Sequence, residues 1–411
     1  MSKSSHFFGQ PMYGQVIKLL DKSKILELSR ENGGERYTKR FNCWIHLVVM
    51  LYAVIMRFDS LREITASLLA EARKLAHLGI SFKIGRSTLA DANKRRPEVI
   101  FEGIYRHLYA TYRHTLSSDS RSRKTPKWMK RLQIIDSTTI TLFSNMLFKG
   151  VGRHPKTGKK KGGIKVHTVI HANEGVPSDI KFTSAATNDS FMLKPSSLKQ
   201  GDIMAMDRAY IDYAKFEELT RRKVIYVTKM KKSLKYKILS DTMYQTPEGL
   251  MEVRIQKVEF SKRVSKGEAI THQARIVTYV DTTKARPKLI ALLTNDMEWD
   301  PSEIIAIYRQ RWEIELLFKQ MKQNFPLKYF YGESANAIKI QIWVTLIANL
   351  LLMVMQKGLR RKWSFSGLAT MVRINMMYYV DFYSLFNNPD KDWESILSEA
   401  SGSPPQPSLF D

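Results

Sequence analysis

The chain has a single cysteine, Cys43, among its 411 residues. One cysteine cannot close a disulfide within the chain or supply the several thiolates of a structural zinc site, and this indicates a reducing compartment. The first residues, "MSKSSHFFGQPMYGQ", lack the apolar core and cleavage site of a secretory signal peptide. These absences exclude a disulfide scaffold and a thiolate metal cage, and they predict a cytoplasmic protein.

Uninterrupted apolar runs long enough to cross a membrane are also missing. The stretch 44–58 contains His46 and ends near Arg57, and the stretch 340–355 is interrupted by Gln341 and Asn349. A spanning helix needs about 20 predominantly apolar residues. Both stretches are therefore predicted to be buried core helices, and no membrane partner is expected.

Acidic residues are scarce relative to basic ones: 39 Asp and Glu stand against 66 Lys and Arg, which gives a net charge of +27. Such an excess favours a polyanionic partner, and nucleic acid is the leading candidate. The alternative is a basic protein whose charge only keeps it soluble. With 44% hydrophobic residues the chain is globular, and its length predicts two or three domains.

Residues 1–116 have the pattern of a helical region. Ser60 and Glu63 form a capping box before an apolar period of about 3.6 residues. A turn glycine, Gly85, is followed by a second expected capping box, Thr88 with Asp91. These signals predict helices that begin near residues 60 and 88.

The second of these helices is short and basic. It ends in Lys94, Arg95 and Arg96 before Pro97. A helix, a glycine-containing turn and a short basic helix together resemble a helix-turn-helix DNA reader, although any helical bundle offers such pairs. The three basic residues are therefore candidate DNA contacts.

After residue 128 the apolar pattern changes from helical to strand-like. Residues 162–185 read as two strands around an Asn-Glu-Gly turn, and residues 229–294 alternate strands and turns. The predicted fold is therefore an α/β core preceded by an all-α domain. The expected division is 1–116 helical DNA-binding domain, 117–128 linker, 129–228 first part of the core, 229–296 β-rich insertion, 297–385 helical remainder of the core, and 386–411 disordered tail.

Two acids stand where apolar strands end. Asp136 follows "QII" and Asp207 follows "IMAM". A carboxylate held by a buried strand needs a partner, because an unpaired buried charge is expensive. One interpretation is a salt bridge or a helix cap. The other is that both carboxylates share divalent metal ions, since Mg²⁺ prefers hard oxygen ligands, and two such ions support phosphodiester cleavage.

The stretch "YRQRWEIELLFKQMK" (308–322) places a third acid, Glu315, in a basic helix. Tyr308, Arg311, Glu315 and Lys322 share one helical face, with Lys319 also in phase. This face is either an ordinary solvated surface or an acid presented among cations that hold phosphates. Periodicity alone does not separate the two.

The same four residues resemble a known signature. Y-x2-R-x3-E-x6-K is similar to the signature of the IS-four group of bacterial insertion-sequence transposases. "DRAY" (207–210) resembles the block around the second acid of that group, with Ala209 for the usual glycine, and "IIDSTTI" resembles its first-acid strand. The turn at 187–189 departs from the group, which leaves the role of Asp189 open. The resemblance covers roughly residues 130–355.

The resemblance implies a ribonuclease-H-like core of the DDE type with residues 229–294 as an insertion. Asp136, Asp207 and Glu315 would be the catalytic, metal-binding triad and would hold two Mg²⁺ ions, for which Mn²⁺ can substitute. Tyr308, Arg311 and Lys322 would contact DNA near the scissile phosphate, and further DNA contacts are expected from Lys319, Arg208, Tyr210 and Lys165.

Three other features allow narrower expectations. Trp312 could stack on an extruded base or pack in the core. The basic loop 153–165 lacks the order of a phosphate-binding P-loop, so DNA backbone contact or simple solvation is expected there. His167 and His171 share a strand face without a third ligand, so His167 is expected to line the core instead of binding zinc.

The C-terminal "QPSLFD" suggests a protein partner. Gln406, Leu409 and Phe410 resemble the anchors of the short peptide by which bacterial proteins dock on the DNA polymerase sliding clamp, although six residues also arise by chance.

The sequence thus predicts a cut-and-paste DNA transposase that acts on double-stranded DNA as a homodimer, in the bacterial cytoplasm and associated with the nucleoid. The alternatives are a metal-dependent nuclease that cuts without joining, and an inactive helix-turn-helix regulator. The presence of all three acids argues against the inactive form.

Overall fold

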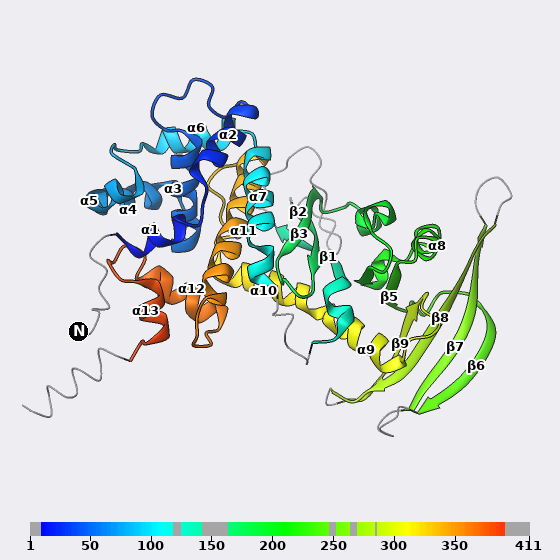
Figure 1. The fold of residues 1–411 in the computed structure, drawn as a ribbon. Coiled ribbons are helices and arrows are strands. Elements are labelled where there is room, and N and C mark those ends of the chain that lie inside the picture. The colour runs from blue at the N-terminus through cyan, green and yellow to red at the C-terminus, as the bar shows by residue number, and fades with distance from the viewer. Residues whose placement is uncertain are drawn as a thin grey trace, which may run out of the picture. The chain divides into compact units, whose positions relative to one another are not determined.

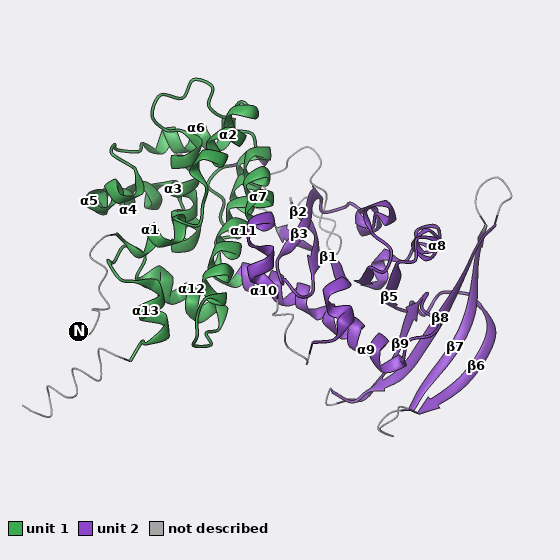
Figure 2. Cartoon of the chain, in the orientation of Figure 1, with its two compact units in different colours: residues 1–108, 323–332, 336–411 green, residues 109–322, 333–335 purple. Residues whose placement is uncertain are grey.

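The computed structural model describes residues 10–117, 125–141, 163–245, 252–263, 269–283 and 286–390, in a mixed α/β arrangement (Figure 1). The chain divides into two compact units (Figure 2). The helical unit comprises residues 1–108, 323–332 and 336–411, and the sheet unit comprises residues 109–322 and 333–335. This division groups the last helices with the first ones, whereas the sequence-based scheme assigned residues 297–385 to the catalytic core.

Every described element between Met12 and Leu116 is a helix. The helices that lie wholly or mainly in the helical unit, or begin in it, are α1 (Met12–Ile17), α2 (Lys22–Glu31), α3 (Cys43–Met56), α4 (Leu61–Ala70), α5 (Ala72–Leu75), η1 (Ala76–Leu78), α6 (Arg86–Arg95), α7 (Val99–Leu116), α11 (Ala335–Lys357), α12 (Phe365–Ile374) and α13 (Phe382–Asn387).

The two apolar stretches of the sequence form α3 and α11, which are the buried centre of the helical unit. All residues of α3 from Cys43 to Ile55 are buried. By length and composition α11 could cross a membrane, but 89% of its most apolar window is buried within the structure. The pair α3 and α4 passes the same test only if taken together, and it is bent by 101°. Both stretches therefore pack as core helices, as the sequence predicts.

One of the two expected capping boxes is confirmed. Ser60 Oγ accepts from the Glu63 N–H, and the Glu63 carboxylate accepts from the Asp59 N–H. The second is wrong, because α6 begins at Arg86 with Gly85 as its N-cap and has no side-chain cap bond. The helix thus starts earlier than Thr88, which lies inside its first turn.

His46 is a fully buried histidine in α3. Its Nε2 lies 2.8 Å from Asn93 Oδ1, and its Nδ1 has no hydrogen-bond partner among the described residues. Burial, together with the positive charge of Arg96, lowers the pKa of His46 from 6.5 to about 3. Protonation of this ring therefore opposes the folded state.

Lowering the pH from 7 to 5 is expected to destabilise the protein through His46. Between the two pKa values the unfolded chain binds the proton and the folded chain does not, so stability falls as the pH falls. At pH 5 the expected loss is about 2 kcal/mol. Urea unfolding at both pH values should show this loss in the wild type and its absence in His46→Gln. Equal losses in the two proteins would contradict the assignment.

The sheet unit is built on one nine-stranded sheet with the order β3-β2-β1-β4-β5-β9-β8-β7-β6. Its strands are β1 (Leu132–Thr141), β2 (Gly163–His171), β3 (Pro177–Ser184), β4 (Ile203–Met206), β5 (Ile225–Lys229), β6 (Lys237–Gln245), β7 (Glu252–Arg263), β8 (Ala269–Asp281) and β9 (Lys288–Thr294). Its helical elements are η2 (Lys127–Arg131), η3 (Asp189–Met192), η4 (Pro195–Ser197), η5 (Arg208–Tyr210), α8 (Tyr213–Arg221), α9 (Pro301–Gln310) and α10 (Trp312–Asn324), the last of which ends in the helical unit.

The order and direction of the first five strands fit a ribonuclease-H-like core. β1, β4 and β5 are parallel, whereas β2 and β3 run antiparallel as the expected hairpin. The four strands β6 to β9 continue the sheet from β5 in antiparallel pairs. They are the β-rich segment that the sequence places between the second and third acids.

Side-chain alternation gives the central strands two buried faces. Ile135 and Met206 belong to the core cluster that includes Phe216 and Leu219 of α8. Asp136 follows Ile135 within β1, and Asp207 follows Met206 as the N-cap of η5. α9 packs against β4, β5 and β9. This packing brings Arg311, between α9 and α10, close to Asp136.

The stretch 308–322 is not one continuous helix. α9 ends at Gln310 and α10 begins at Trp312, with Arg311 between them. The Arg311 backbone keeps a right-handed helical conformation, with φ −54° and ψ −26°, and its N–H donates to the Tyr308 carbonyl at 3.1 Å. The break therefore stays within a single residue.

Candidate active site

Asp136 and Asp207 lie side by side because β1 and β4 are parallel neighbours. Asp207 follows the last residue of β4, as predicted, but Asp136 lies within β1, because pairing with β2 continues that strand to Thr141. Ile135 pairs with Met206 in the register, and each acid is the next residue along its strand. Each carboxylate accepts a hydrogen bond from the following backbone N–H at 2.8 Å, Asp136 from Ser137 and Asp207 from Arg208. Local backbone geometry therefore holds both carboxylates in place.

Arg311 connects the first acid to the third. Its Nη2 lies 2.6 Å from Glu315 Oε1, and its Nη1 lies 3.5 Å from Asp136 Oδ2. The guanidinium is 15% exposed, so water screens both ion pairs only in part. Glu315 stands in the first turn of α10, where a carboxylate is favoured by the helix dipole.

The electrostatics show that all three acids belong to one cluster. Burial, the largest cause, and the charges of Asp207 and Glu315 together raise the pKa of Asp136 to about 6, although the Ser137 N–H and Arg311 act to lower it. Three carboxylates against one guanidinium leave an excess of two negative charges.

This donor set fits a divalent cation by its chemistry. Carboxylate oxygens are the ligands that Mg²⁺ prefers, and a doubly positive ion matches the excess charge. In the described part of the chain, however, no three carboxylate, histidine or cysteine side chains already converge as a ready metal site. Arg311 instead lies between Asp136 and Glu315 and forms an ion pair with each of them.

Basic and aromatic side chains surround the acids. Lys322 Nζ donates to Thr138 Oγ1 at 2.7 Å and to the Thr139 carbonyl at 3.3 Å, which places it beside β1 just past Asp136. The Arg311 guanidinium lies 5.7 Å from the Tyr308 ring centroid. Tyr308 is itself close enough to Asp207 for that charge to raise its pKa, although burial is the larger cause.

Trp312 is 55% exposed, and Leu316, one turn further along α10, is 43% exposed. This exposure places the indole on the surface instead of in the core. Of the two interpretations left open by the sequence, the placement therefore favours a stacking surface.

The other expected DNA contacts differ in accessibility. Lys319, Arg208, Lys94 and Arg95 are exposed. Tyr210 is fully buried and Arg96 is only 6% exposed. Because a buried side chain offers no surface to DNA, these two residues are not placed for the direct contact that the sequence suggested. Arg96 bonds the Gly34 and Phe41 carbonyls instead, and Tyr210 packs in the core of the sheet unit.

A cluster beside Asp136 was not predicted from the sequence. Asp189 Oδ1 accepts from Ser137 Oγ at 2.7 Å and lies 3.3 Å from Lys165 Nζ, and His167 Nδ1 is 3.4 Å away. Lys165 is thus engaged with Asp189, and its side chain is only 14% exposed. The cluster anchors the residue after Asp136 to η3.

The signal for this cluster was the strand alternation that puts Lys165 and His167 on one face of β2. This alternation alone does not predict the cluster, because the cluster also requires η3 to lie beside β1. His167 is 0% exposed and bonds Thr183 Oγ1 at 2.7 Å, so it lines the core as expected.

Gln406, Leu409 and Phe410, together with most of the loop 153–165, lie outside the described residues.

Comparison with known proteins agrees with this geometry. Residues 127–351 match the family model described as a transposase DDE domain, and residues 8–81 match a domain of unknown function. A Sinorhizobium fredii protein named as a transposase, y4zB, is 29% identical over 66% of this chain and 71% of its own length. A protein named as a transposase for insertion sequence element IS5377, from Geobacillus stearothermophilus, is 21% identical over 79% of this chain and 80% of its own length.

A third relative, from Synechocystis, is named as a transposase for insertion sequence element IS4SA and is 25% identical over 65% of this chain and 70% of its own length. Among solved structures, a piggyBac transposase synaptic complex with hairpin DNA covers 97% of this chain and 87% of its own, at 12% identity and a TM-score of 0.44, a likeness too low to carry an argument. The matched DDE domain spans more than half of the chain and contains Asp136, Asp207 and Glu315: the chain belongs to the DDE transposases of bacterial insertion sequences.

Proposed function

We propose that this transposase, a member of the IS-four group, moves its element by a cut-and-paste route. It binds the terminal inverted repeats, hydrolyses the 3′ ends in a Mg²⁺-dependent step and joins the freed 3′-OH to target DNA. Synapsis of two ends requires a homodimer on DNA. The protein acts in the bacterial cytoplasm at the nucleoid.

The observation that carries the proposal is the clustering of three acids around one arginine. Asp136, Asp207 and Glu315 come from positions far apart in the sequence, yet the charges of the other two both act on Asp136. A cluster with this excess of negative charge is unfavourable unless a cation or an arginine offsets it. Such a site has a use in an enzyme that binds divalent metal ions.

The three acids would hold two Mg²⁺ ions, with Mn²⁺ as a substitute. When bound, such ions activate a water or hydroxyl and stabilise the departing 3′ oxygen in phosphodiester cleavage. The chain's own task is to hold the ligands: the Ser137 and Arg208 N–H groups orient the two aspartates, and Asp189 orients Ser137.

The surrounding side chains bind and orient DNA. Lys319 and Lys322 on α10 hold phosphates, and Arg311, released from Asp136 and Glu315, pairs with a phosphate while Tyr308 supports its guanidinium. Trp312 stacks on an exposed base. Lys94, Arg95 and Arg208 contribute further backbone contacts from exposed positions, and Lys165 adds one if it leaves Asp189.

The C-terminal residues Gln406, Leu409 and Phe410 dock on the bacterial sliding clamp. This part of the proposal rests on the sequence alone. It fails if a peptide of residues 401–411 shows no binding to a bacterial clamp by fluorescence polarisation.

Incubation of the protein with Mg²⁺, a duplex that carries the element's terminal repeat and a target plasmid tests the proposal. Joined products are expected, because all three acids are present and the freed 3′-OH can attack a second phosphodiester. Nicked ends without joined products would instead identify a nuclease. Retarded DNA that is never cut would identify a regulator.

A further inference from the structure

Three elements of the sheet unit meet at Ser137, the residue that follows Asp136. β1 carries Ser137, β2 pairs with β1 beside it, and η3 reaches it through Asp189. The Ser137 N–H donates to the Asp136 carboxylate at 2.8 Å, and the Ser137 Oγ donates to Asp189 Oδ1 at 2.7 Å. Ser137 therefore bonds a proposed metal ligand through its backbone and Asp189 through its side chain.

β1 has fewer strand partners at this point than earlier along its length. Its ladder with β4 ends at Ile135, whereas its ladder with β2 continues to Thr141. Among the described strands, β2 alone therefore pairs with Asp136 and Ser137. The hydrogen bond from Ser137 to Asp189 is a second tie, and it restrains the chain just where the ladder with β4 has ended.

Asp189 is itself held by an ion pair. Its Oδ1 lies 3.3 Å from Lys165 Nζ, and Lys165 also donates to the Thr187 carbonyl at 2.8 Å. The Lys165 side chain is only 14% exposed and that of Asp189 is 22% exposed, so water screens the pair only in part. Because Lys165 balances its charge, Asp189 restrains Ser137 without adding to the excess negative charge of the three acids.

The neighbouring side chains fix the position of η3. His167 is directly opposite Ser137 in the register of β1 and β2, and its Nδ1 lies 3.4 Å from Asp189 Oδ1. On the other side, Lys215 of α8 donates from Nζ to the Ser190 carbonyl of η3. Asp189 thus projects from a turn that is tied to both β2 and α8.

The same cluster extends to the segment that carries the second aspartate. Tyr210 lies in η5, the turn that follows Asp207, and η3 packs against η5. Burial, the largest cause, and the charges of Asp136, Asp189 and Asp207 together raise the pKa of the Tyr210 phenol. Asp189 therefore lies near both segments that carry a proposed metal-ligating aspartate.

We propose that Asp189 is a positioning residue for the metal-binding centre and that it acts on Asp136 through the Ser137 hydroxyl. It fixes the Asp136 carboxylate relative to that of Asp207, so that the two bind a divalent ion from an ordered arrangement. Its own Oδ1 faces the Ser137 hydroxyl and the Lys165 ammonium. The inference rests on the proposed function in one respect, since it takes the three acids to bind Mg²⁺.

Replacing Ser137 by alanine breaks the hydrogen bond to Asp189 and leaves the ion pair between Lys165 and Asp189 in place. Single-turnover cleavage of end-labelled duplex DNA over a range of Mg²⁺ concentrations gives the half-saturating Mg²⁺ concentration and the rate at saturation. The half-saturating concentration is expected to rise about tenfold or more, since loss of a group that orients a metal ligand typically costs about 10–100-fold in affinity. The rate at saturation should stay within about threefold, because every ligand is still present.

Metal binding in the absence of DNA is the independent readout. Unbound Mn²⁺ gives an electron paramagnetic resonance signal that is lost on binding, so titration of the full chain yields its Mn²⁺ affinity. Ser137→Ala is expected to lower this affinity about tenfold or more. The thermal unfolding midpoint and the DNA affinity in EDTA should remain as in the wild type, which separates lost positioning from lost folding.

A double-mutant cycle tests the route from Asp189 to the metal. Asp189→Ala should lower Mn²⁺ affinity about as much as Ser137→Ala does, and the double variant should bind no more weakly than Asp189→Ala alone, because the two residues act along one connection. A metal ligand would behave differently. If Asp189→Ala is far more severe than Ser137→Ala and the two losses add, Asp189 binds the ion directly and the proposed route is wrong.

Two variants of the same unit are the matched controls. Ser178→Ala removes a serine hydroxyl of β3, which donates to the Val169 carbonyl at 3.1 Å. Asp212→Ala removes the N-cap of α8 and should lower the thermal unfolding midpoint. Both should keep Mn²⁺ affinity within about twofold of the wild type, because neither is coupled to the three acids. If either control loses as much affinity as Ser137→Ala, general destabilisation explains the loss and the inference is wrong.

The failure of this inference and that of the proposed function are distinguishable. If the wild type cleaves DNA with Mg²⁺ and Ser137→Ala keeps the same Mg²⁺ dependence and Mn²⁺ affinity, the inference is wrong and the transposase proposal stands. If the wild type neither cleaves DNA nor binds Mn²⁺, both are wrong.

Discussion

Replacing Glu315 by glutamine is expected to lower the rate of Mg²⁺-dependent DNA strand cleavage by about a thousandfold. The substitution keeps the size and hydrogen-bonding capacity of the side chain but removes one negative charge from the three-acid cluster. Loss of a metal-ligating carboxylate removes several kcal/mol of transition-state stabilisation, and about 4 kcal/mol corresponds to this factor. Single-turnover cleavage of end-labelled duplex DNA would measure it.

Glu313 provides the matched control. It stands in the same first turn of α10, it is exposed, and it has no ion pair among the described residues. Glu313→Gln therefore makes the same chemical change two residues away and should leave the cleavage rate within about twofold. A Glu315→Gln enzyme that cuts within tenfold of the wild type would remove Glu315 from the proposed triad.

Replacing Gln341 by leucine is expected to destabilise the helical unit by about 3 kcal/mol or more. Gln341 is fully buried in α11, accepts from the Tyr331 N–H at 2.8 Å, and donates to the Pro326 and Tyr329 carbonyls at 2.8 Å each. Leucine would leave buried backbone groups without partners, at a cost of about 1–3 kcal/mol each. Urea unfolding would measure the loss.

Thr345, one turn further along α11, is the control for this change. It is also fully buried, but its hydroxyl donates to the Gln341 carbonyl of its own helix at 2.8 Å. Since such a bond adds little to a helix, Thr345→Val should change stability by less than about 1 kcal/mol. If Gln341→Leu is as mild as Thr345→Val, the amide does not hold the 326–331 segment.

The catalytic half of the fold was predictable because its signals are local. Asp136 and Asp207 each follow an apolar run, and two neighbouring parallel strands place such positions side by side, although β1 continues beyond Asp136. The hairpin of β2 and β3 followed from its turn residues, and the β-rich segment from its alternation. The three acids then form one cluster if the helix that carries Glu315 lies near the two aspartates.

The contacts of individual side chains were less predictable. Nothing in the sequence shows that Arg311 bridges Asp136 and Glu315, because that contact depends on how α9 packs on the sheet. Tyr210 and Arg96 belong to polar or basic motifs, yet tertiary packing buries both.

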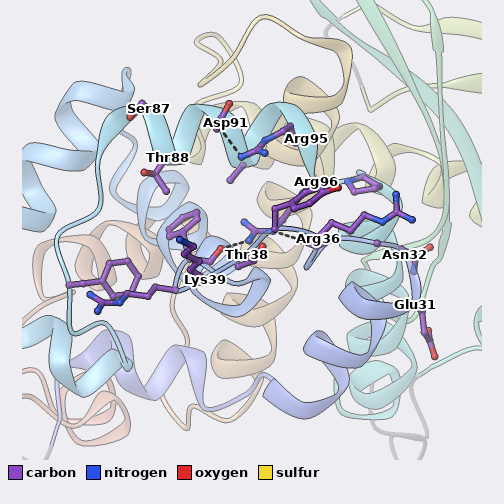
Figure 3. A pocket seen from close by; sticks show the side chains of 18 of the residues that line it. Glu31, Asn32, Arg36, Thr38, Lys39, Ser87, Thr88, Asp91, Arg95 and Arg96 are labelled. Carbon is purple, nitrogen blue, oxygen red and sulfur yellow. Dashed lines mark hydrogen bonds and ion pairs between the residues drawn. The ribbon is translucent and has the colours of Figure 1, made fainter.

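A groove lined by the loop between α2 and α3 and by α6 (Figure 3) was missed for a related reason. The loop from 32 to 42 has neither helical nor strand periodicity, so sequence patterns offered no view of its shape. Tyr37 has a φ of 57° as the third residue of a turn that the Thr38 N–H closes on the Glu35 carbonyl at 3.2 Å. Burial and backbone strain of this kind are properties of the folded chain.

The central claim is that Asp136, Asp207 and Glu315 form one metal-binding centre. Fe²⁺ can replace Mg²⁺ at oxygen-ligand sites and, with ascorbate and peroxide, cut the protein backbone near the ion. Mapping of these cuts by mass spectrometry is predicted to show three sites, near residues 136, 207 and 315, which excess Mg²⁺ suppresses and Glu315→Gln weakens while Glu313→Gln does not. Cuts confined to other parts of the chain, or cuts that Glu315→Gln leaves unchanged, would contradict the claim.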